Sequence, residues 1–233
     1  MKIKFVIPAR GGSKGIPGKN IKILGGAPLI NHTLNQARRF VNDDDIIVTT
    51  DDDKIITTLE SLDYKVPFKR PDELASDQAG MNDVLMHAVK YLEAQREEFD
   101  VMVLLQPTSP FRKDEHIQQA LDTFTTTKPD MVVSVKETRS NPYYLLVEEN
   151  QEGILQKVKE HDSIRRQDTP VVYEFNGAVY VIDVNKLKEL GLSGLKHKRK
   201  IVMDETSSHD LDEMLDWYIA EMIIDKNIDK IDA

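Results

Sequence analysis

Short apolar runs alternate with longer segments of helical periodicity along the first half of the chain. Strands are predicted at residues 3–8, 45–49, 65–69, 101–105 and 131–135, where the apolar runs are short. Helices are predicted near residues 29–37, 53–62, 82–95 and 114–126, where apolar residues recur every three or four positions. This alternation indicates an α/β fold with a mostly parallel sheet and helices on both faces. Such sheets bind ligands beyond the carboxyl ends of their strands, so the loops after residues 8 and 105 should line one crevice.

The alternating pattern stops between about residues 139 and 173. Two short runs, at residues 143–147 and 154–158, flank the polar segment 149–153 and predict a hairpin. An interruption of this kind is typical of a lid or a dimerisation arm, although a plain surface hairpin explains the pattern equally well.

Beyond this interruption, one more strand and one more helix are predicted. The strand is expected at residues 178–181. The helix is amphipathic, and its apolar face contains Leu211, Leu215, Tyr218, Ile219 and Met222. A length of 233 residues suits one α/β domain, so residues 1–233 are predicted to form a single domain.

The charge balance excludes one class of partner. The sequence has 31 Lys and Arg against 40 Asp and Glu, a net charge of −9, which argues against a surface that binds nucleic acid. No cysteine is present, so disulfides and thiolate metal sites are excluded and a reducing cytoplasm is the expected compartment. The sequence also has no apolar span of the ~20 residues that a membrane helix needs, so no membrane association is expected.

The segment after the first predicted strand combines glycines with fixed cations. It contains Gly11, Gly12, Gly15 and Gly18 together with Arg10, Lys14 and Lys19. Backbone amides that glycine frees, with three cations around them, could surround a triphosphate. An ordinary P-loop is not supported, because it would need glycine at Ser13 and a hydroxyl residue at Asn20. A mobile surface turn is the alternative interpretation.

A pair of carboxylates near the end of the chain is a candidate metal site. Asp210 and Asp212 flank Leu211 and share one side of the chain if the backbone there is extended. Mg²⁺ prefers a few carboxylates together with phosphate oxygens, so this pair would suit triphosphate chemistry if it faced the glycine-rich segment. The alternative is that an aspartate here only caps the following helix. Two other acidic runs, at residues 43–45 and 51–53, are interpreted as turns and caps.

These segments resemble the acylneuraminate cytidylyltransferase family, the CMP-sialic acid synthetases, together with its relatives for legionaminic and pseudaminic acid. The matching positions are residues 7–15 with Lys19-Asn20, Arg70-Pro71 with Glu73-Leu74-Ala75 and Asp77, residues 105–110, Asn176-Gly177-Ala178 with Tyr180, and Asp210-Leu211-Asp212. Their order and spacing agree with the family over almost the whole chain. Residues 13–20 are closer to the sialic acid enzymes than to the bacterial relative that activates the eight-carbon sugar Kdo. One departure is Met81, which stands where some members have serine.

The resemblance implies a Rossmann-like nucleotide-diphospho-sugar transferase fold, dependence on Mg²⁺, and a homodimer in which residues 139–173 form the dimerisation arm. The implied reaction transfers CMP from CTP to the anomeric hydroxyl of an acidic nine-carbon keto sugar and releases pyrophosphate. Another acidic acceptor such as Kdo, or a catalytically silent nucleotide-binding protein, stays open as an alternative.

The resemblance also implies roles for individual residues of this chain. Arg10, Lys14 and Lys19 would hold the CTP phosphates and, with Asp212, carry the catalysis. Asn20, Arg70 and Ala79 would lie around the ribose and cytosine. Gln106, Asn176 and Tyr180 would contact the sugar, with Arg166 as a partner for its carboxylate. Asp210 and Asp212 would hold the metal.

Overall fold

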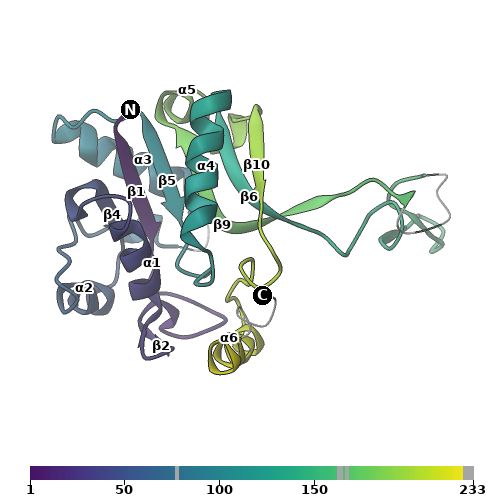
Figure 1. The fold of residues 1–233 in the computed structure, drawn as a ribbon, viewed down its shortest axis with the longest axis horizontal. Coiled ribbons are helices and arrows are strands. Elements are labelled where there is room, and N and C mark those ends of the chain that lie inside the picture. The colour runs from purple at the N-terminus through teal and green to yellow at the C-terminus, as the bar shows by residue number, and fades with distance from the viewer. Residues whose placement is uncertain (77–78, 162–164, 166–167, 228–233) are drawn as a thin grey trace.

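The computed structural model describes residues 1–76, 79–161, 165 and 168–227, and a six-stranded sheet forms its centre (Figure 1). The strand order is β10-β6-β9-β5-β1-β4. The strands are β1 (Ile3–Pro8), β4 (Ile46–Thr49), β5 (Val101–Leu105), β6 (Met131–Glu137), β9 (Tyr173–Asp183) and β10 (Lys198–Val202). All neighbouring strands are parallel except β9, which runs antiparallel to both β5 and β6. The predicted mostly parallel sheet is confirmed.

Helices cover both faces of the sheet, as predicted. On one face α1 (Leu29–Arg38), α2 (Asp53–Glu60) and α4 (Asp114–Thr127) contribute to one apolar cluster, and on the other α3 (Met81–Ala94) and α5 (Val184–Gly194) contribute to a second. Side chains alternate along a strand, so Phe5 and Ile7 enter the first cluster while Val6 enters the second. The continuous apolar runs in the sequence therefore come from burial on both faces.

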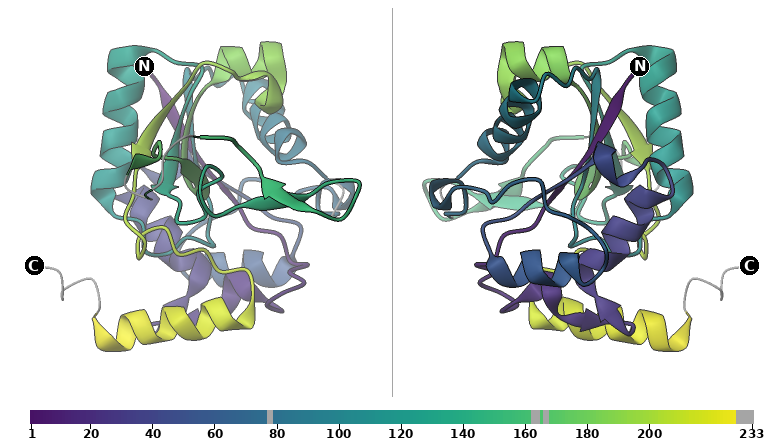
Figure 2. Two further views of the ribbon diagram at one scale, coloured as in Figure 1. Left: turned by 90° about the vertical axis from the view of Figure 1, so that its right-hand side faces the viewer. Right: turned by 90° about the vertical axis from the view of Figure 1, so that its left-hand side faces the viewer.

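A third apolar cluster lies below the carboxyl ends of the strands. The last helix, α6 (Met214–Lys226), runs along the foot of the molecule, where Figure 2 shows it beside the first part of the chain. Its fully buried Trp217 packs with Ile16 of the glycine-rich segment and with Leu211. The same region holds the short helix η1 (Lys19–Ile21) and the two-stranded sheet of β2 (Ile23–Leu24) and β3 (Ala27–Pro28). A part of the chain that follows β1 thus packs against its last helix.

The predicted apolar face of the last helix is wrong. Leu215, Tyr218 and Met222 are exposed, by 67%, 59% and 49%, and the buried positions of the helix are Trp217, Ala220 and Ile223. Both faces of this helix carry apolar residues, so periodicity alone could not decide which one meets the core. The large indole of Trp217 is fully buried in the third cluster.

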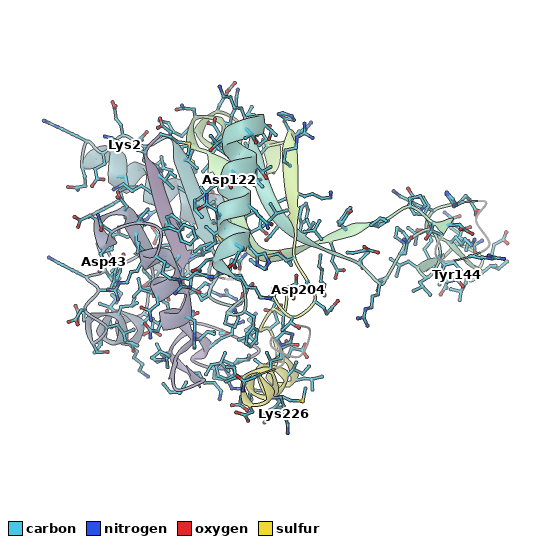
Figure 3. All side chains as sticks on the ribbon, in the orientation of Figure 1. Lys2, Asp43, Asp122, Tyr144, Asp204 and Lys226 are labelled. Carbon is cyan, nitrogen blue, oxygen red and sulfur yellow. The ribbon has the colours of Figure 1, made fainter. Side chains whose placement is uncertain are left out.

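Residues 139–173 include an arm that projects from the sheet (Figure 1). At its end, β7 (Val147–Glu149) and β8 (Leu155–Lys157) form the predicted hairpin, with shorter strands than the apolar runs indicated. Residues 142–145 form turns instead of strand. Tyr144 lies far out on this arm in Figure 3, and its side chain is 41% exposed.

Two further differences from the predicted elements have simple causes. The strand expected at residues 65–69 is only one parallel bridge between Lys69 and Thr50, because Pro67 lacks an amide donor. The elements α5 and β10 were not predicted. A kink at Gly191, where φ is +65°, interrupts the periodicity of α5, and β10 begins with the exposed Lys198, Arg199 and Lys200 at an edge of the sheet. No helix among the described residues is long and apolar enough to cross a membrane.

Candidate active site

Two adjoining cavities open at the carboxyl ends of the parallel strands. The first, of about 480 Å³, is lined by residues that follow β1 and β5, among them Arg10, Pro107 and Thr108. The second, of about 500 Å³, lies beside β9. Gln106, Asp210 and Asp212 line both cavities. The prediction that the loops after residues 8 and 105 line one crevice is confirmed.

The glycine-rich segment is tied to the sheet by its backbone. The Ala9 amide donates to the Thr49 carbonyl (3.0 Å), and the Gly11 amide donates to Asp51 Oδ1 (3.2 Å). Asn20 Nδ2 donates to the Arg10 carbonyl (2.9 Å), which closes the segment on itself. These bonds hold the segment against the ends of β1 and β4 and favour a built binding loop over a surface turn.

Lys19 joins the first loop to the Asp210-Leu211-Asp212 segment. Its ammonium donates to the Leu211 carbonyl and lies 3.5 Å from Asp212 Oδ1. The side chain of Lys19 is only 9% exposed, whereas that of Asp212 is 75% exposed. The cation is therefore fixed, and the carboxylate beside it faces the open crevice.

Gly15 lies directly against the backbone of the acidic segment. A Cβ added to Gly15 would lie 2.0 Å from the Asp212 carbonyl oxygen, a distance that the backbone cannot accept without moving. By contrast, a Cβ on Gly12 would meet nothing within 4 Å. Only glycine fits at position 15, because any side chain there would push the acidic segment away from the loop.

The acidic pair does not cap the last helix. Glu213 is the N-cap of α6 and forms a capping box with Asp216, whose Oδ2 accepts from the Asp212 and Glu213 amides at 3.0 and 2.7 Å. Leu211 is fully buried between the two aspartates, and both aspartates line the cavities. The capping alternative for Asp210 and Asp212 is therefore wrong.

The electrostatics of this pair fit a divalent cation. Burial raises the pKa of Asp210 above its usual value, and the charge of Asp212 adds to the shift. A cation shared by the two carboxylates would relieve this repulsion. Within the described part of the chain, no group of three or more His, Asp or Glu side chains forms a ready metal site. A metal here would need phosphate oxygens as additional ligands.

Arg70 also lines the first cavity, where it forms an ion pair with Asp51. It is 3% exposed, and its Nη2 donates to Asp51 Oδ1 at 3.0 Å. The Arg70 amide also donates to the Thr50 carbonyl at 2.7 Å. Asp51 thus binds both Arg70 and the Gly11 amide, so it is more than the turn residue that the sequence predicted.

The second cavity contains three of the predicted sugar-contacting residues, Gln106, Asn176 and Tyr180. Asn176 is buried, its Oδ1 accepts from Ser134 Oγ (2.6 Å), and its Nδ2 donates to Ser208 Oγ (2.9 Å). This internal network already uses its amide, so the sugar contact of Asn176 stays a prediction. Elsewhere in the wall, Lys136 bridges Glu174 (3.1 Å) and Glu205 (3.0 Å).

Most of the predicted site residues meet at these two cavities. The first is lined by Arg10, Lys19, Asn20, Arg70, Ala79, Gln106, Asp210 and Asp212. Lys14 is exposed and lines neither cavity. Arg166 lies outside the described residues.

Sequence reasoning gave no role in the site to four residues that build this region: Asp51, Thr108, Ser109 and Arg112. Of these, Thr108 and Ser109 stand within the matching segment 105–110. The Leu211 amide donates to the Thr108 carbonyl (2.9 Å), and Ser109 Oγ donates to Asp210 Oδ1 (3.4 Å). Asp51 could have been found from its position, since it follows β4 at the carboxyl edge of the sheet. The buried Arg112 gave no comparable signal.

Comparison with known proteins agrees with this geometry. The cytidylyltransferase family model matches residues 4–222. Post-translational flagellin modification protein B of Campylobacter coli is 31% identical over 232 residues, which cover 97% of each chain. The CMP-N,N'-diacetyllegionaminic acid synthase of Legionella pneumophila is 31% identical over 229 residues, 97% of this chain and 98% of that one.

A solved structure shows the same fold. The CMP:2-keto-3-deoxy-manno-octonic acid synthetase in complex with CTP superposes with a TM-score of 0.71 at 16% identity, over 97% of this chain and 100% of that one. The family match spans nearly all the described elements, and the resemblance seen in the sequence is confirmed. The chain belongs to the cytidylyltransferase family and is a nucleotidyltransferase enzyme.

Proposed function

We propose that the protein transfers CMP from CTP to the anomeric hydroxyl of an acidic nine-carbon keto sugar of the sialic acid type, and releases pyrophosphate. One observation carries this proposal: the two cavities share Gln106, Asp210 and Asp212. Two substrates bound side by side would meet at these three residues, where the phosphate of one can react with the hydroxyl of the other.

The first cavity suits CTP. Arg10 and Lys19 on one wall would bind the phosphates, and Asn20, Arg70 and Ala79 would surround the ribose and the base. Lys14 is close in sequence but exposed, so its proposed phosphate contact requires the loop to close over the nucleotide. Because Lys19 is already fixed by the Leu211 carbonyl, little ordering would be needed at this cation when CTP binds.

We propose Mg²⁺ as the cofactor, held by Asp210 and Asp212 together with phosphate oxygens. When bound, the ion would offset negative charge on the triphosphate. Arg10 and Lys19 orient the α-phosphate, so that the sugar hydroxyl oxygen attacks phosphorus in line with the departing pyrophosphate. The new bond joins the sugar oxygen to phosphorus, the bond to the β-phosphate oxygen breaks, and the hydroxyl proton is lost to solvent.

The second cavity suits the acceptor. Gln106 and Tyr180 reach it from β5 and β9, and burial raises the pKa of the Tyr180 hydroxyl, which keeps it a neutral donor. The Legionella relative is named for a CMP-activated legionaminic acid, which supports a nine-carbon acceptor. The eight-carbon acid named in the structural neighbour is the alternative acceptor, supported by its shared fold.

We further propose that the protein is a cytoplasmic homodimer, with residues 1–233 as one domain and 139–173 as its dimerisation arm. An isolated two-stranded hairpin is only marginally stable in water. Apolar side chains on the arm are nevertheless exposed, among them Leu146 (41%), Val147 (52%) and Leu155 (66%). A second copy of the chain would cover them. The absence of cysteine supports a reducing compartment.

Pyrophosphate release tests the proposed reaction. Purified protein with CTP and Mg²⁺ should release pyrophosphate only when a nine-carbon keto sugar acid is added, and the sugar should be recovered as its CMP adduct. Kdo, UTP and ATP serve as comparisons for acceptor and base. Turnover with Kdo alone would establish the alternative acceptor. CTP binding without turnover of any acid would indicate a silent nucleotide-binding protein.

A further inference from the structure

Arg112 is a fully buried cation behind the wall that both cavities share. It follows β5 by seven residues and is 3% exposed. Burial lowers the pKa of its guanidinium to about 9, and the charge of Asp210 acts against that shift. Arg112 therefore stays positively charged at neutral pH. It lines neither cavity, so it touches no substrate in the proposed reaction.

The guanidinium makes four hydrogen bonds, and all four acceptors are neutral oxygens. Nη1 donates to the carbonyl oxygens of Gln106 (2.8 Å) and Ala178 (2.9 Å). Nη2 donates to Thr33 Oγ1 (2.6 Å), and Nε donates to Gln36 Oε1 (2.6 Å). A buried charge that is bonded only to neutral groups is costly to desolvate. Its place in the fold therefore needs a reason other than stability.

The four acceptors belong to three elements that meet at the site. Gln106 directly follows β5 and lines both cavities, and Ala178 lies on β9 directly after the Asn176-Gly177 pair of the second cavity. Thr33 and Gln36 lie three residues apart on the buried side of α1. Gln36 also donates back to the Arg112 carbonyl (2.8 Å). One side chain thus fixes two walls of the crevice to the helix behind them.

We propose that Arg112 is a positioning residue that fixes the chain just beyond the last β5–β9 pair, Leu105 and Val179, and so aligns the acceptor with the α-phosphate. One nitrogen of the planar guanidinium bonds both main-chain carbonyls, and the other two nitrogens bond side chains of α1. The single ammonium of a lysine cannot make all four of these bonds. This inference rests on the proposed cytidylyl transfer.

Arg112→Lys tests the fork while keeping the charge. At saturating substrates, kcat should fall about tenfold or more, because small displacements of aligned groups have large effects on rate. The dissociation constant of CTP, measured by calorimetry, should stay within about threefold, because Arg10, Lys19 and Arg70 still form its site. The control is Arg39→Met, on the exposed end of α1, where Arg39 bonds Asp114 (2.7 Å). That variant should keep both constants.

Thr33→Val is a second and milder test, because it removes one acceptor and nearly keeps the side-chain shape. We expect kcat to fall about threefold, with CTP binding unchanged, although Thr33 touches neither cavity. This variant decides the question if Arg112→Lys does not fold.

Three outcomes would overturn the inference. Variants that melt at lower temperature but keep the kcat of the wild type would show that Arg112 only stabilises the fold. Variants that weaken CTP binding and leave kcat unchanged would show that it supports the nucleotide site alone. A wild-type protein that turns over no acid with CTP would overturn the proposed function and, with it, this inference.

Discussion

The base of the crevice and the projecting arm are built in opposite ways. At the base, the glycine-rich segment, Leu211 and Trp217 are packed together and joined by the Lys19 bond to the Leu211 carbonyl. On the arm, every residue of β7 and β8 is exposed, and the two strands pair only with each other. The base is complete within one chain, whereas the arm exposes apolar side chains that a single chain does not cover.

The comparison separates the region where we propose the chemistry from the region where we propose association. A site that must hold a triphosphate needs groups fixed in advance, and burial within one chain fixes them. A surface that must recognise another chain has to remain exposed until that chain arrives. Substitutions at the base should therefore change turnover, and substitutions on the arm should change association. Four experiments test this contrast.

Asp212→Asn should have the largest effect. It removes charge from the proposed metal site while keeping size, so turnover should fall about 10³-fold, equivalent to about 4 kcal/mol. The Asp212 side chain is 75% exposed, and the melting temperature should change little. Asp225→Asn, on the exposed side of α6, is the matched control. Near-normal kinetics for Asp212→Asn would remove Asp212 from the catalytic machinery.

Lys19→Met should come next. Methionine keeps the apolar stem and removes the charge, and loss of one donor that stabilises the transition state costs about 3 kcal/mol, or roughly 10² in kcat. Steady-state kinetics with calorimetric CTP binding would separate kcat from affinity. Lys90→Met, at an exposed position of α3, is the control. If kcat and KM both stay within about threefold, a difference of ~0.7 kcal/mol, the loop does not act on the phosphates.

Gly15→Ala should have a moderate effect, on stability as well as rate. The new methyl group would lie 2.0 Å from the Asp212 carbonyl oxygen, and overpacking of this kind costs about 2 kcal/mol. Thermal melting should fall by roughly 4–8 °C for a domain of this size. Gly12→Ala is a close control, because its added Cβ meets nothing within 4 Å. Equal stability of the two variants would mean that position 15 is not in close contact with the Asp212 carbonyl.

The arm should give the smallest effect on folding. Replacing Leu146 and Leu155 with serine should change the stability of the folded chain by no more than about 0.5 kcal/mol, as is usual for exposed positions. Light scattering should nevertheless show a shift from a dimer to a mass near 26.6 kDa. Leu190→Ser, on α5, should leave the dimer intact. A wild-type protein that is already monomeric at micromolar concentration would contradict the proposed dimer.

The sequence predicted the sheet and most of its helices because their periodicity follows directly from burial on one or two faces. It did not predict that β9 runs antiparallel, because the apolar pattern of a strand is the same whichever direction the strand runs in the sheet. It also placed the wrong face of α6 in the core, because Leu215, Tyr218 and Met222 are as apolar as the buried residues.

The candidate site was predictable where residues stand in recognisable motifs. Arg10, Lys19, Asp210 and Asp212 lie around one cavity as expected. Asp51 and Arg112 were missed because their importance comes from tertiary partners, the Gly11 amide and the Gln106 carbonyl, that no local pattern reveals. Lys14 shows the opposite case, a motif residue that is exposed and lines neither cavity.

The bond between Lys19 and the Leu211 carbonyl joins residues that are 192 positions apart. A ribosome that adds about 5–20 residues per second makes Leu211 roughly 10–40 s after Lys19. Throughout that interval the growing chain carries the glycine-rich loop without the acidic segment that closes it. The side chain of Lys19 therefore gains this acceptor late in synthesis, after all six strands of the central sheet have been made.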